Sequence, residues 1–420
     1  MFFRFCLYGF LKNQRYFEPF LILIFLEKGL SFFQIGLLVA FREVVVNLFE
    51  IPSGVIADVW GRRKSMVLSY SAYIASFLVF GLAEHVVVLF VAMFLFAVGE
   101  AFRSGTHKAM IFTWLRLQGR EKERTQVYGY TRSWSKFGSA LSVVLAAFFV
   151  YAYDSYTYVF YCSVVPYLLG IINILGYPQQ LDGTVDREIS FAQMGRHLKE
   201  SFKEAFGNIH LRRLIAESMG FQGAYHVAKD YLQPVLKGAA LIAAGHWLAN
   251  DHMSDIQKST LLVGPVYLIL YLLAGVASRN AHRVVALLGH AENAAHFLWG
   301  SAAFLFLGMA GASFFQIDFV LIVVFVFLDV LQNLWRPVQL GRLDTHGREE
   351  QGALLLSIES QMRRASTMVM APLMGLAVDM VIVHEIGGPF WPVGLFGVVV
   401  TLLFLVTGLR TSSRRVVFFC

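Results

Sequence analysis

The sequence predicts an all-α membrane protein with twelve transmembrane helices, because of its composition, the spacing of its apolar stretches and the sidedness of its basic residues. Hydrophobic residues make up 57% of the 420 residues and charged residues only 15%, whereas a soluble domain is about half apolar and a quarter charged. A helix needs roughly 20 mostly apolar residues to cross a bilayer. Twelve stretches meet this length, at residues 5–26, 32–57, 65–84, 86–112, 127–151, 156–176, 213–236, 260–278, 294–314, 318–340, 355–378 and 392–410.

The basic residues predict the orientation, because Lys and Arg are retained on the cytoplasmic side of a membrane. With the N-terminus inside, the cytoplasmic stretches hold twenty-one Lys and Arg residues, and the outer stretches hold only Lys28, Lys237 and Lys258. We therefore expect a multi-pass protein of the cytoplasmic (inner) membrane with both termini in the cytoplasm. The first stretch has no signal-peptide pattern, since Lys12 and Arg15 interrupt it.

Residues 177–212 separate the sixth apolar stretch from the seventh. Within them Phe191, Met194, Leu198 and Phe202 recur at helical spacing, which is typical of an amphipathic helix on a membrane surface. The predicted organisation is therefore an N-terminal six-helix bundle (1–176), a cytoplasmic amphipathic linker (177–212) and a C-terminal six-helix bundle (213–420).

The segment Gly54-Val-Ile-Ala-Asp58-Val-Trp-Gly61-Arg62-Arg63-Lys64 joins the second and third stretches. Its small residues allow two helices to approach closely, and the connection has room only for a tight hairpin. The segment resembles the loop signature of major facilitator superfamily (MFS) transporters, Gly-x-x-x-Asp-x-x-Gly-Arg-Arg/Lys. This resemblance implies the MFS fold, in which the first, fourth, seventh and tenth helices line a central cavity and parallel six-helix repeats form the two halves.

Two further patterns are consistent with such a duplication. A degraded copy of the loop segment runs from Gly275 to Arg283 after the eighth stretch. In addition, Glu100-Ala-Phe-Arg103 in the fourth stretch matches Asn333-Leu-Trp-Arg336 in the tenth. Both matches lie at corresponding places in the two predicted halves.

Ionisable residues inside a membrane span cost free energy and are by default functional candidates. Residues three, four or seven positions apart share a helix face, and five stretches carry such polar stripes, the first of which includes Lys12. The candidates for solute binding or ion coupling are Arg15, Glu18, Glu43, Asn47, Glu100, Arg103, His107, His226, Lys229, Asp230, Asp329, Asn333 and Arg336. Arg15 and Glu43 form either a structural ion pair or part of the solute or proton site, and Glu217, on the opposite face from His226, is assigned to packing.

A second group of charged residues lies nearer the predicted cytoplasmic ends. The MFS resemblance implies that Asp58 contacts the start of the eleventh helix and holds the inward side shut, and a carboxylate near a helix N-terminus is favoured by the helix dipole. The candidate gate residues are Gly54, Asp58, Gly61, Arg62, Arg63, Arg132, Glu359 and Arg363.

Several other function classes find no support in the sequence. The histidines form no ligand spacing with carboxylates, the cysteines are far apart, and no phosphate-binding loop of the Gly-x-x-x-x-Gly-Lys-Ser/Thr type occurs. We therefore expect no metal, no cofactor, no ATP drive and no enzymatic activity. The basic residues follow the membrane topology, so the net charge of +7 does not indicate nucleic-acid binding.

The sequence thus predicts a secondary active transporter that moves a small charged or zwitterionic organic solute by alternating access, as a monomer in the lipid bilayer. Proton coupling is the simplest drive, with Glu18, Glu43 and Asp230 as candidate carriers, and sodium is the alternative. A multidrug/proton efflux antiporter is the second hypothesis. Met93 stands where the usual fourth-helix signature has Arg, and the Gly-Pro pattern of drug antiporters is missing between Gly138 and Ala147. A transport-inactive membrane sensor or scaffold is the third hypothesis.

Overall fold

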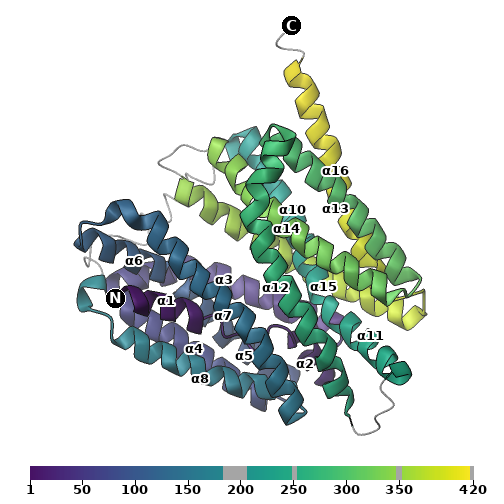
Figure 1. The fold of residues 1–420 in the computed structure, drawn as a ribbon, viewed down its shortest axis with the longest axis horizontal. Helices are drawn as coiled ribbons and strands as arrows, with labels where there is room; N and C mark the ends of the chain where they lie inside the picture. Colours follow the sequence, from purple (N-terminus) through teal and green to yellow (C-terminus); the bar gives the residue numbers. More distant parts are fainter. Residues whose placement is uncertain (183–205, 248–252, 347–351, 417–420) are drawn as a thin grey trace. The chain divides into compact units, whose positions relative to one another are not determined.

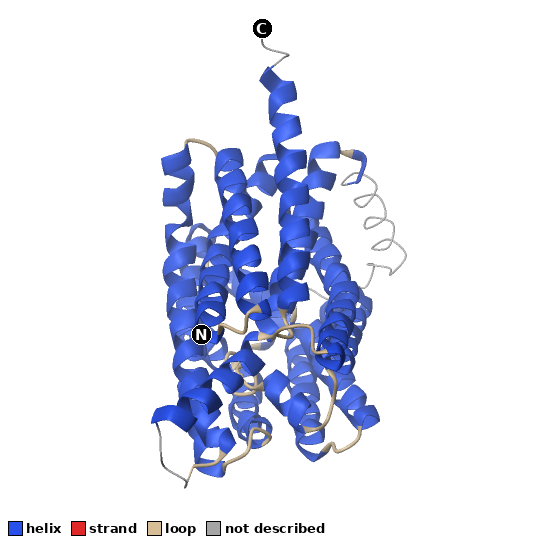
Figure 2. Ribbon diagram, turned by 90° about the vertical axis from the view of Figure 1, so that its right-hand side faces the viewer, coloured by secondary structure: helices blue, strands red, loops and turns tan. Residues whose placement is uncertain are grey.

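The structure is a computed structural model that describes residues 1–182, 206–247, 253–346 and 352–416. This part of the chain is built from α-helices and two short 3-10 helices, joined mostly by short connections (Figures 1 and 2). Nine helical segments in it are long and apolar enough to cross a membrane, and Phe2–Leu11 and Trp391–Thr407 are shorter apolar helices. The predicted all-α membrane fold is confirmed, and the helices account for all twelve predicted spans.

The helices follow the predicted apolar stretches in order. The first six stretches contain α1 (Phe2–Leu11), α2 (Leu21–Glu27), α3 (Phe32–Trp60), α4 (Arg62–Leu82), α5 (Val86–Arg103), α6 (Thr106–Leu117), α7 (Arg124–Tyr153) and α8 (Tyr158–Leu175), with 3-10 helices η1 (Glu121–Glu123) and η2 (Gln179–Asp182). The last six contain α10 (Ile209–Asp230), α11 (Leu232–Trp247), α12 (Asp255–Leu288), α13 (Ala291–Phe314), α14 (Asp318–His346), α15 (Gly352–His384) and α16 (Trp391–Val416).

The first span is broken, which corrects the prediction of one helix over residues 5–26. Helix α1 ends at Leu11, and α2 begins only at Leu21. The break is polar, and its side chains bond to backbone carbonyls: Asn13 donates to Gly9 (2.7 Å) and Gln14 donates to Gly138 (3.2 Å). Such bonds compete with helix formation, and Pro19 disfavours helical backbone at the residue before it. The spacing of Lys12, Arg15 and Glu18 predicts that they share a helix face. Because of the break, they do not.

The fourth and seventh spans are also each made of two helices. Ser104 and Gly105 separate α5 from α6, and Gly105 has a φ of +74°, which an L-residue rarely adopts. Tyr231 separates α10 from α11, where Pro234 removes a backbone donor within the first turn of α11. Non-helical backbone inside a membrane span is tolerated where protein or a polar cavity satisfies it. Three of the four spans that the MFS resemblance assigns to the cavity are thus discontinuous.

The second half also has longer helices than predicted. Helix α12 continues to Leu288, so Arg279 and Arg283 lie within it rather than in a loop. The turn that follows is made at Gly289, which has a φ of +80°. Arg342 is one of the twenty-one basic residues assigned above to the cytoplasmic stretches. It lies within α14, and its side chain is only 2% exposed.

The chain forms two compact units. Unit 1 lies within Met1–Leu30, Phe41–Arg196 and Ala244–Tyr271, and unit 2 lies within Ser31–Ala40, His197–Ala243 and Leu272–Cys420. These units differ from a division at the predicted linker. The start of α3 belongs to unit 2, and the first half of α12 belongs to unit 1. Most of that linker, 183–205, is outside the described residues, so the predicted domain organisation stays a proposal.

Each unit has an aromatic core that fixes its helices around the polar residues. In unit 1, rings of Tyr73, Phe77, Phe96 and Tyr167 pack at centroid distances of 5.0–6.4 Å. In unit 2, the ring centroid of Phe221 lies 5.1 Å from that of Trp299 and 4.8 Å from that of Trp335. Buried aromatic side chains of this size dominate the apolar contacts of a core.

Candidate solute-binding site

The predicted tight hairpin between the second and third spans is confirmed. Only Gly61 lies between α3 and α4, and its φ of +103° is available to glycine but strained for other residues. Asp58 pairs with Arg62 (3.2 Å), and Arg62 also donates to Thr113 of α6 (2.9 Å). The basic triplet thus begins α4 instead of occupying a loop.

The hairpin is tied to the end of the sixth span. The Asp182 carboxylate accepts a hydrogen bond from the Arg63 backbone N–H (2.7 Å) and pairs with its guanidinium (3.4 Å). Arg63 also donates to the Tyr177 carbonyl. Gly54 differs from Gly61, since a Cβ added there would meet no described atom within 4 Å. Among the described residues, no neighbouring helix therefore packs closely against Gly54.

Two arginines of unit 1 have tyrosine hydroxyls as their neighbours. Arg103, at the end of α5, donates to the Tyr73 hydroxyl (3.4 Å), interacts with Tyr8 and has Glu100 at 3.9 Å. Arg15, in the break of the first span, interacts with the Tyr167 hydroxyl, and its buried Nε has no hydrogen-bond partner among the described residues. Among the described residues, neither Arg103 nor Arg15 therefore makes a short bond to a carboxylate.

Further charged groups lie close to these two arginines. Lys12 is near enough to Arg15, Arg103 and Arg132 to interact with them electrostatically. Arg132 is exposed on α7 and stacks over Tyr128 at 6.0 Å. The structure therefore gathers four basic side chains from α5, α7 and the broken first span. The acidic neighbours in the same unit are Glu100 and Glu18, and Glu18 interacts with the Tyr271 hydroxyl of α12.

Other sequence candidates in unit 1 are packed into helix contacts. His107 is buried, stacks on Tyr8 at 3.5 Å and faces the Tyr177 hydroxyl (3.1 Å). Burial raises the pKa of Tyr177, so its hydroxyl stays protonated and donates to the Arg4 carbonyl (3.2 Å). Glu43 is buried in α3 and accepts two bonds from its neighbour Arg42 (2.9 and 2.6 Å), and Asn47 lies one turn further along α3.

In unit 2, the candidate Arg336 is held by a carboxylate. Its guanidinium forms a two-pronged ion pair with Glu359 of α15 (2.6 and 2.8 Å). The Ser218 hydroxyl of α10 also donates to Glu359, whose side chain is 0% exposed. A predicted solute residue, Arg336, and a predicted gate residue, Glu359, therefore form one ion pair, in which only Glu359 is fully buried. Arg363, on the same helix, donates to Gln222 (3.0 Å).

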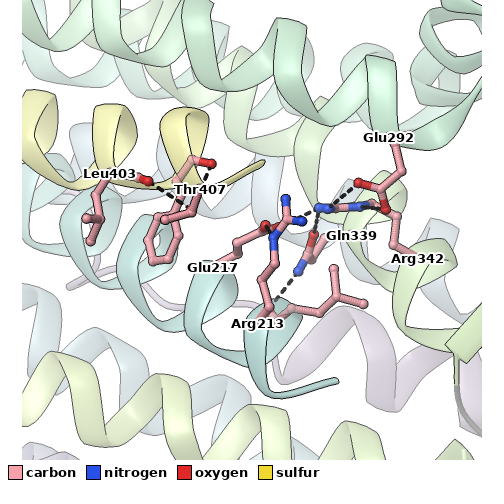
Figure 3. Close-up of polar contacts among 9 residues, drawn as sticks. Arg213, Glu217, Glu292, Gln339, Arg342, Leu403 and Thr407 are labelled. Carbon is pink, nitrogen blue, oxygen red and sulfur yellow. Dashed lines mark hydrogen bonds and ion pairs between the residues drawn. The ribbon is translucent and has the colours of Figure 1, made fainter. Parts of the chain in front are cut away.

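The largest ion network in the described chain was missed by the sequence reasoning. Arg342 donates to Glu217 (2.6 Å) and to Glu292 (3.0 and 2.8 Å), joining α10, α13 and α14 (Figure 3). Arg213 donates to the other oxygen of Glu217 (2.8 Å), and Gln339 accepts a bond from Arg342 (2.7 Å). Only the i, i+4 spacing of Arg213 and Glu217 was visible in the sequence.

The remaining candidates lie on α10 and α14. Asp329 is buried and accepts hydrogen bonds from the Tyr225 hydroxyl and the Asn333 amide (3.2 Å). His226 is exposed on α10, with its ring 5.6 Å from that of Tyr225. Lys229 and Asp230 are the last residues of α10, at the break of the seventh span.

Two arginines of unit 2 thus differ from two arginines of unit 1 in the groups that surround them. Arg336 and Arg342 each make short bonds to carboxylates, whereas Arg15 and Arg103 mainly face tyrosine hydroxyls. Within the described residues, no group of three or more His, Cys, Asp or Glu residues could hold a metal ion.

Helices of this number and apolarity define a polytopic membrane protein, and three of its spans carry charged residues at their breaks. The chain belongs to the Major Facilitator Superfamily, whose sequence model matches residues 3–355. A curated relative, the uncharacterized MFS-type transporter YxaM of Bacillus subtilis (strain 168), is 25% identical over 224 residues, which cover 52% of this chain and 54% of that protein. The chain therefore spans about half the length of the curated relative it matches.

Solved structures of transporters share the fold. The nucleoside transporter NupG superposes with a TM-score of 0.74 at 11% identity, covering 97% of this chain and 96% of that one. A POT family transporter in complex with 5-aminolevulinic acid gives 0.69 at 14% identity, covering 97% and 96%. A D-xylose-proton symporter gives 0.63 at 14% identity, covering 96% of each chain. At these identities the similarity shows the fold alone.

Proposed function

We propose that this protein is a secondary active transporter that moves a small charged or zwitterionic organic solute across the cytoplasmic membrane by alternating access, coupled to protons. Membership of a transporter superfamily supports the class. In such folds, the substrate site lies between repeats and is built on discontinuous helices. We further propose that the protein acts as a monomer with both termini in the cytoplasm.

The observation that supports the solute class is that Arg15 and Arg103 face mainly tyrosine hydroxyls. Two guanidinium groups with tyrosine hydroxyls around them keep donors available for an incoming anion. Arginine's planar fork binds carboxylate or phosphate in two-pronged fashion, and Lys12 adds a third basic side chain nearby. Glu18 and Glu100 lie beside these cations, so a solute that also carries a positive charge finds acidic partners.

The other sequence candidates take different roles in this proposal. Arg336 bonds to Glu359 and Arg363 bonds to Gln222, and through these contacts they hold helices of unit 2 together. Asp58, Arg62 and Arg63 act at the cytoplasmic gate, where the charge of Asp58 is available to a second helix terminus when the gate closes.

The test is a thermal-shift screen of the purified protein in detergent with organic anions, amino acids, peptides, sugars and lipophilic cations. A ligand that binds only the folded state raises the melting temperature. Each hit is repeated with Arg103→Gln and with Arg116→Gln, an exposed arginine on α6. We expect anionic or zwitterionic hits whose affinity falls roughly 10- to 100-fold in Arg103→Gln, the usual effect of losing a charged hydrogen bond.

The control variant Arg116→Gln should respond like the parent protein. Hits confined to lipophilic cations, with Arg103→Gln responding equally, would contradict the proposed solute class and favour the multidrug antiporter. Uptake of a confirmed anion into liposomes with an imposed proton gradient would then test the transport step itself.

A further inference from the structure

Three basic side chains of unit 1 lie against two aromatic rings between α6 and α7. Lys108 Nζ of α6 lies 5.5 Å from the ring centroids of both Phe112 and Tyr128. The Arg132 guanidinium lies 6.0 Å from the Tyr128 centroid, and the Arg124 guanidinium lies 5.5 Å from the Phe112 centroid. The two rings pack against each other at a centroid distance of 6.4 Å. We call Arg132, Lys108 and Arg124 the basic row.

The spacing of these residues along the two helices produces the row. Arg124, Tyr128 and Arg132 are four residues apart on α7, and Lys108 and Phe112 are four apart on α6, so each set shares a helix face. An α-helix rises about 1.5 Å per residue, and the row therefore extends about 12 Å along α7. The two rings are half-buried and the three basic side chains are exposed. The rings thus fix the row, and its basic groups stay accessible.

One end of the row meets the candidate solute site. Lys12 is near enough to Arg132, and also to Arg103 and Arg15, to interact with them electrostatically. The basic side chains of the candidate site therefore continue through Arg132 and Lys108 to Arg124 at the start of α7. The proposed topology places this end of α7 on the cytoplasmic side.

Within the described residues, two members of the row have no carboxylate partner. Lys108 and Arg132 make contacts with rings but no hydrogen bond or ion pair with an acidic side chain. Arg124 pairs with Glu121 (2.9 Å), and both side chains of that pair are exposed, where an ion pair contributes little to stability. Basic groups gathered in this way repel one another, and their contacts with ring faces offset only part of the repulsion. A bound anion would remove it.

We propose that Lys108, Arg124 and Arg132 form a second anion subsite, which holds the carboxylate or phosphate group of the solute between the cytoplasmic end of unit 1 and Arg103. This inference rests on the proposed function and adds that the anionic group of the solute is bound at two places in turn. A lipid headgroup carries the same phosphate chemistry, but the continuity of the row with Lys12 and Arg103 favours a solute. Such a row also attracts anions and speeds their association in a salt-dependent way.

The direct test measures how strongly a single cysteine beside the row prefers an anionic reagent, and it needs no solute. Gly129 follows Tyr128 on α7, and a Cβ added there meets no described atom within 4 Å. Gly129→Cys is therefore made in a protein whose three native cysteines are replaced by alanine. The purified protein in detergent reacts with two methanethiosulfonates of similar size, one anionic and one cationic.

A potential of one kT per unit charge changes the ratio of the two reaction rates by about 7-fold. We therefore expect Gly129→Cys to prefer the anionic reagent by at least about 5-fold at low salt, relative to free cysteine. Ala152→Cys, an exposed site near the other end of α7, is the control and should show no such preference. Inorganic phosphate should slow the anionic reagent at Gly129→Cys saturably, compared with chloride at equal ionic strength.

Substitutions in the Gly129→Cys protein assign the preference to the row. Lys108→Gln and Arg132→Gln should each lower it at least about 2-fold, whereas Lys108→Arg should keep it. Lys122→Gln is the matched control, because it removes an exposed basic side chain of η1 that lies outside the row, and it should leave the preference unchanged. A preference equal to that of free cysteine would overturn the inference. Equal losses in Lys108→Gln and Lys122→Gln would also overturn it, since they indicate only the general charge of this surface.

A lipid occupant is distinguished by repeating the labelling in nanodiscs. Protein in phosphatidylcholine nanodiscs should keep both the preference and its protection by phosphate, and added phosphatidylglycerol should affect Gly129→Cys no more than Ala152→Cys. If phosphatidylglycerol protects Gly129→Cys selectively and phosphate does not protect it, the row binds a lipid headgroup and the solute subsite is wrong.

The solute proposal can fail separately. An anionic preference that depends on Lys108, together with a screen that yields only lipophilic cations, would keep the anion subsite and contradict the solute class. In the reverse case, anionic hits that depend on Arg103, with no anionic preference at Gly129→Cys, would keep the solute site and remove this inference.

Discussion

The carboxylate of Asp379 caps the N-terminus of α3, accepting hydrogen bonds from the backbone N–H groups of Phe32 (3.0 Å) and Phe33 (2.8 Å). The first N–H groups of a helix have no partner within the helix, and a negative charge there is favoured by the helix dipole. The start of the second span is therefore held by the eleventh. On the other unit, Asp154 at the end of α7 accepts from the Ser254 hydroxyl just before α12. Under the predicted duplication, these two contacts occupy equivalent places.

Replacing Asp379 with Asn should weaken this cap, because the charge is lost and an amide offers only one acceptor oxygen. We expect a loss of about 1 kcal/mol, the usual contribution of an N-cap, visible as a lower melting temperature in detergent. A cysteine introduced at Ser31 should also react faster with a water-soluble maleimide. Glu385→Gln, an exposed site near the end of α15, is the control. Equal labelling rates in Asp379→Asn and the parent would show that the cap does not restrain α3.

Arg342→Gln should be among the most destabilising single changes in the C-terminal half. It leaves Glu217, which is 0% exposed, with Arg213 alone and leaves Glu292 without its partner. Breaking a buried ion pair from one side costs about 3–5 kcal/mol. The double variant Arg342→Gln/Glu217→Gln should recover part of this loss, since it also removes the buried charge. Additive effects of the two changes would contradict a direct coupling between these residues.

The two glycines of the hairpin segment should respond differently to alanine. Gly61→Ala places a side chain at a φ of +103°, and such strain costs of order 1–3 kcal/mol. Gly54→Ala lies within α3 with no described atom near its added Cβ, so it should be neutral or stabilise by about 0.4–1 kcal/mol. Melting temperatures of both variants in one detergent check this. A larger loss in Gly54→Ala than in Gly61→Ala would be inconsistent with the structure.

Two glycines of α7, Gly138 and Gly129, are a matched pair of substitution sites that tests how the broken first span packs against α7. A Cβ at Gly138 would lie 2.6 Å from the Phe10 carbonyl oxygen, whereas one at Gly129 would meet no described atom within 4 Å. Gly138→Ala should therefore cost about 1–3 kcal/mol, as overpacking does, and should weaken binding of any anion that depends on Arg103. Gly129→Ala should leave both the melting temperature and that affinity unchanged. Similar effects of the two substitutions would show that α1 does not pack against Gly138.

Much of the fold could be read from the sequence, because hydropathy is a local signal. The twelve spans and the tight turn at Gly61 follow from runs of apolar residues and from one glycine-bounded motif. The breaks near Lys12 and at Tyr231 could not be placed this way. Both breaks are polar segments inside stretches that are apolar overall, and a break becomes stable only when side chains such as Gln14 find backbone partners on another helix.

For the candidate site too, the sequence identified some residues, whereas only the structure showed their partners. Sequence spacing selected Arg15, Arg103, Arg336 and Asp329, since each is an ionisable residue within an apolar stretch. It could not show that Arg336 is bound to Glu359, because these residues come from different helices. It assigned Glu217 to packing without naming the partner, and the structure shows that Glu217 forms a buried pair with Arg342.

The sequence by itself determined the class of this protein, since the free energy of moving apolar and charged residues into a bilayer depends on composition and order along the chain. Only the tertiary structure decided which charges are satisfied. Burial and pairing depend on neighbours from distant spans, as when Tyr225 reaches Asp329 and Asp379 reaches Phe32. The contacts of Arg15 and Arg103 with tyrosine hydroxyls, from which the solute class is proposed, become visible only at that level.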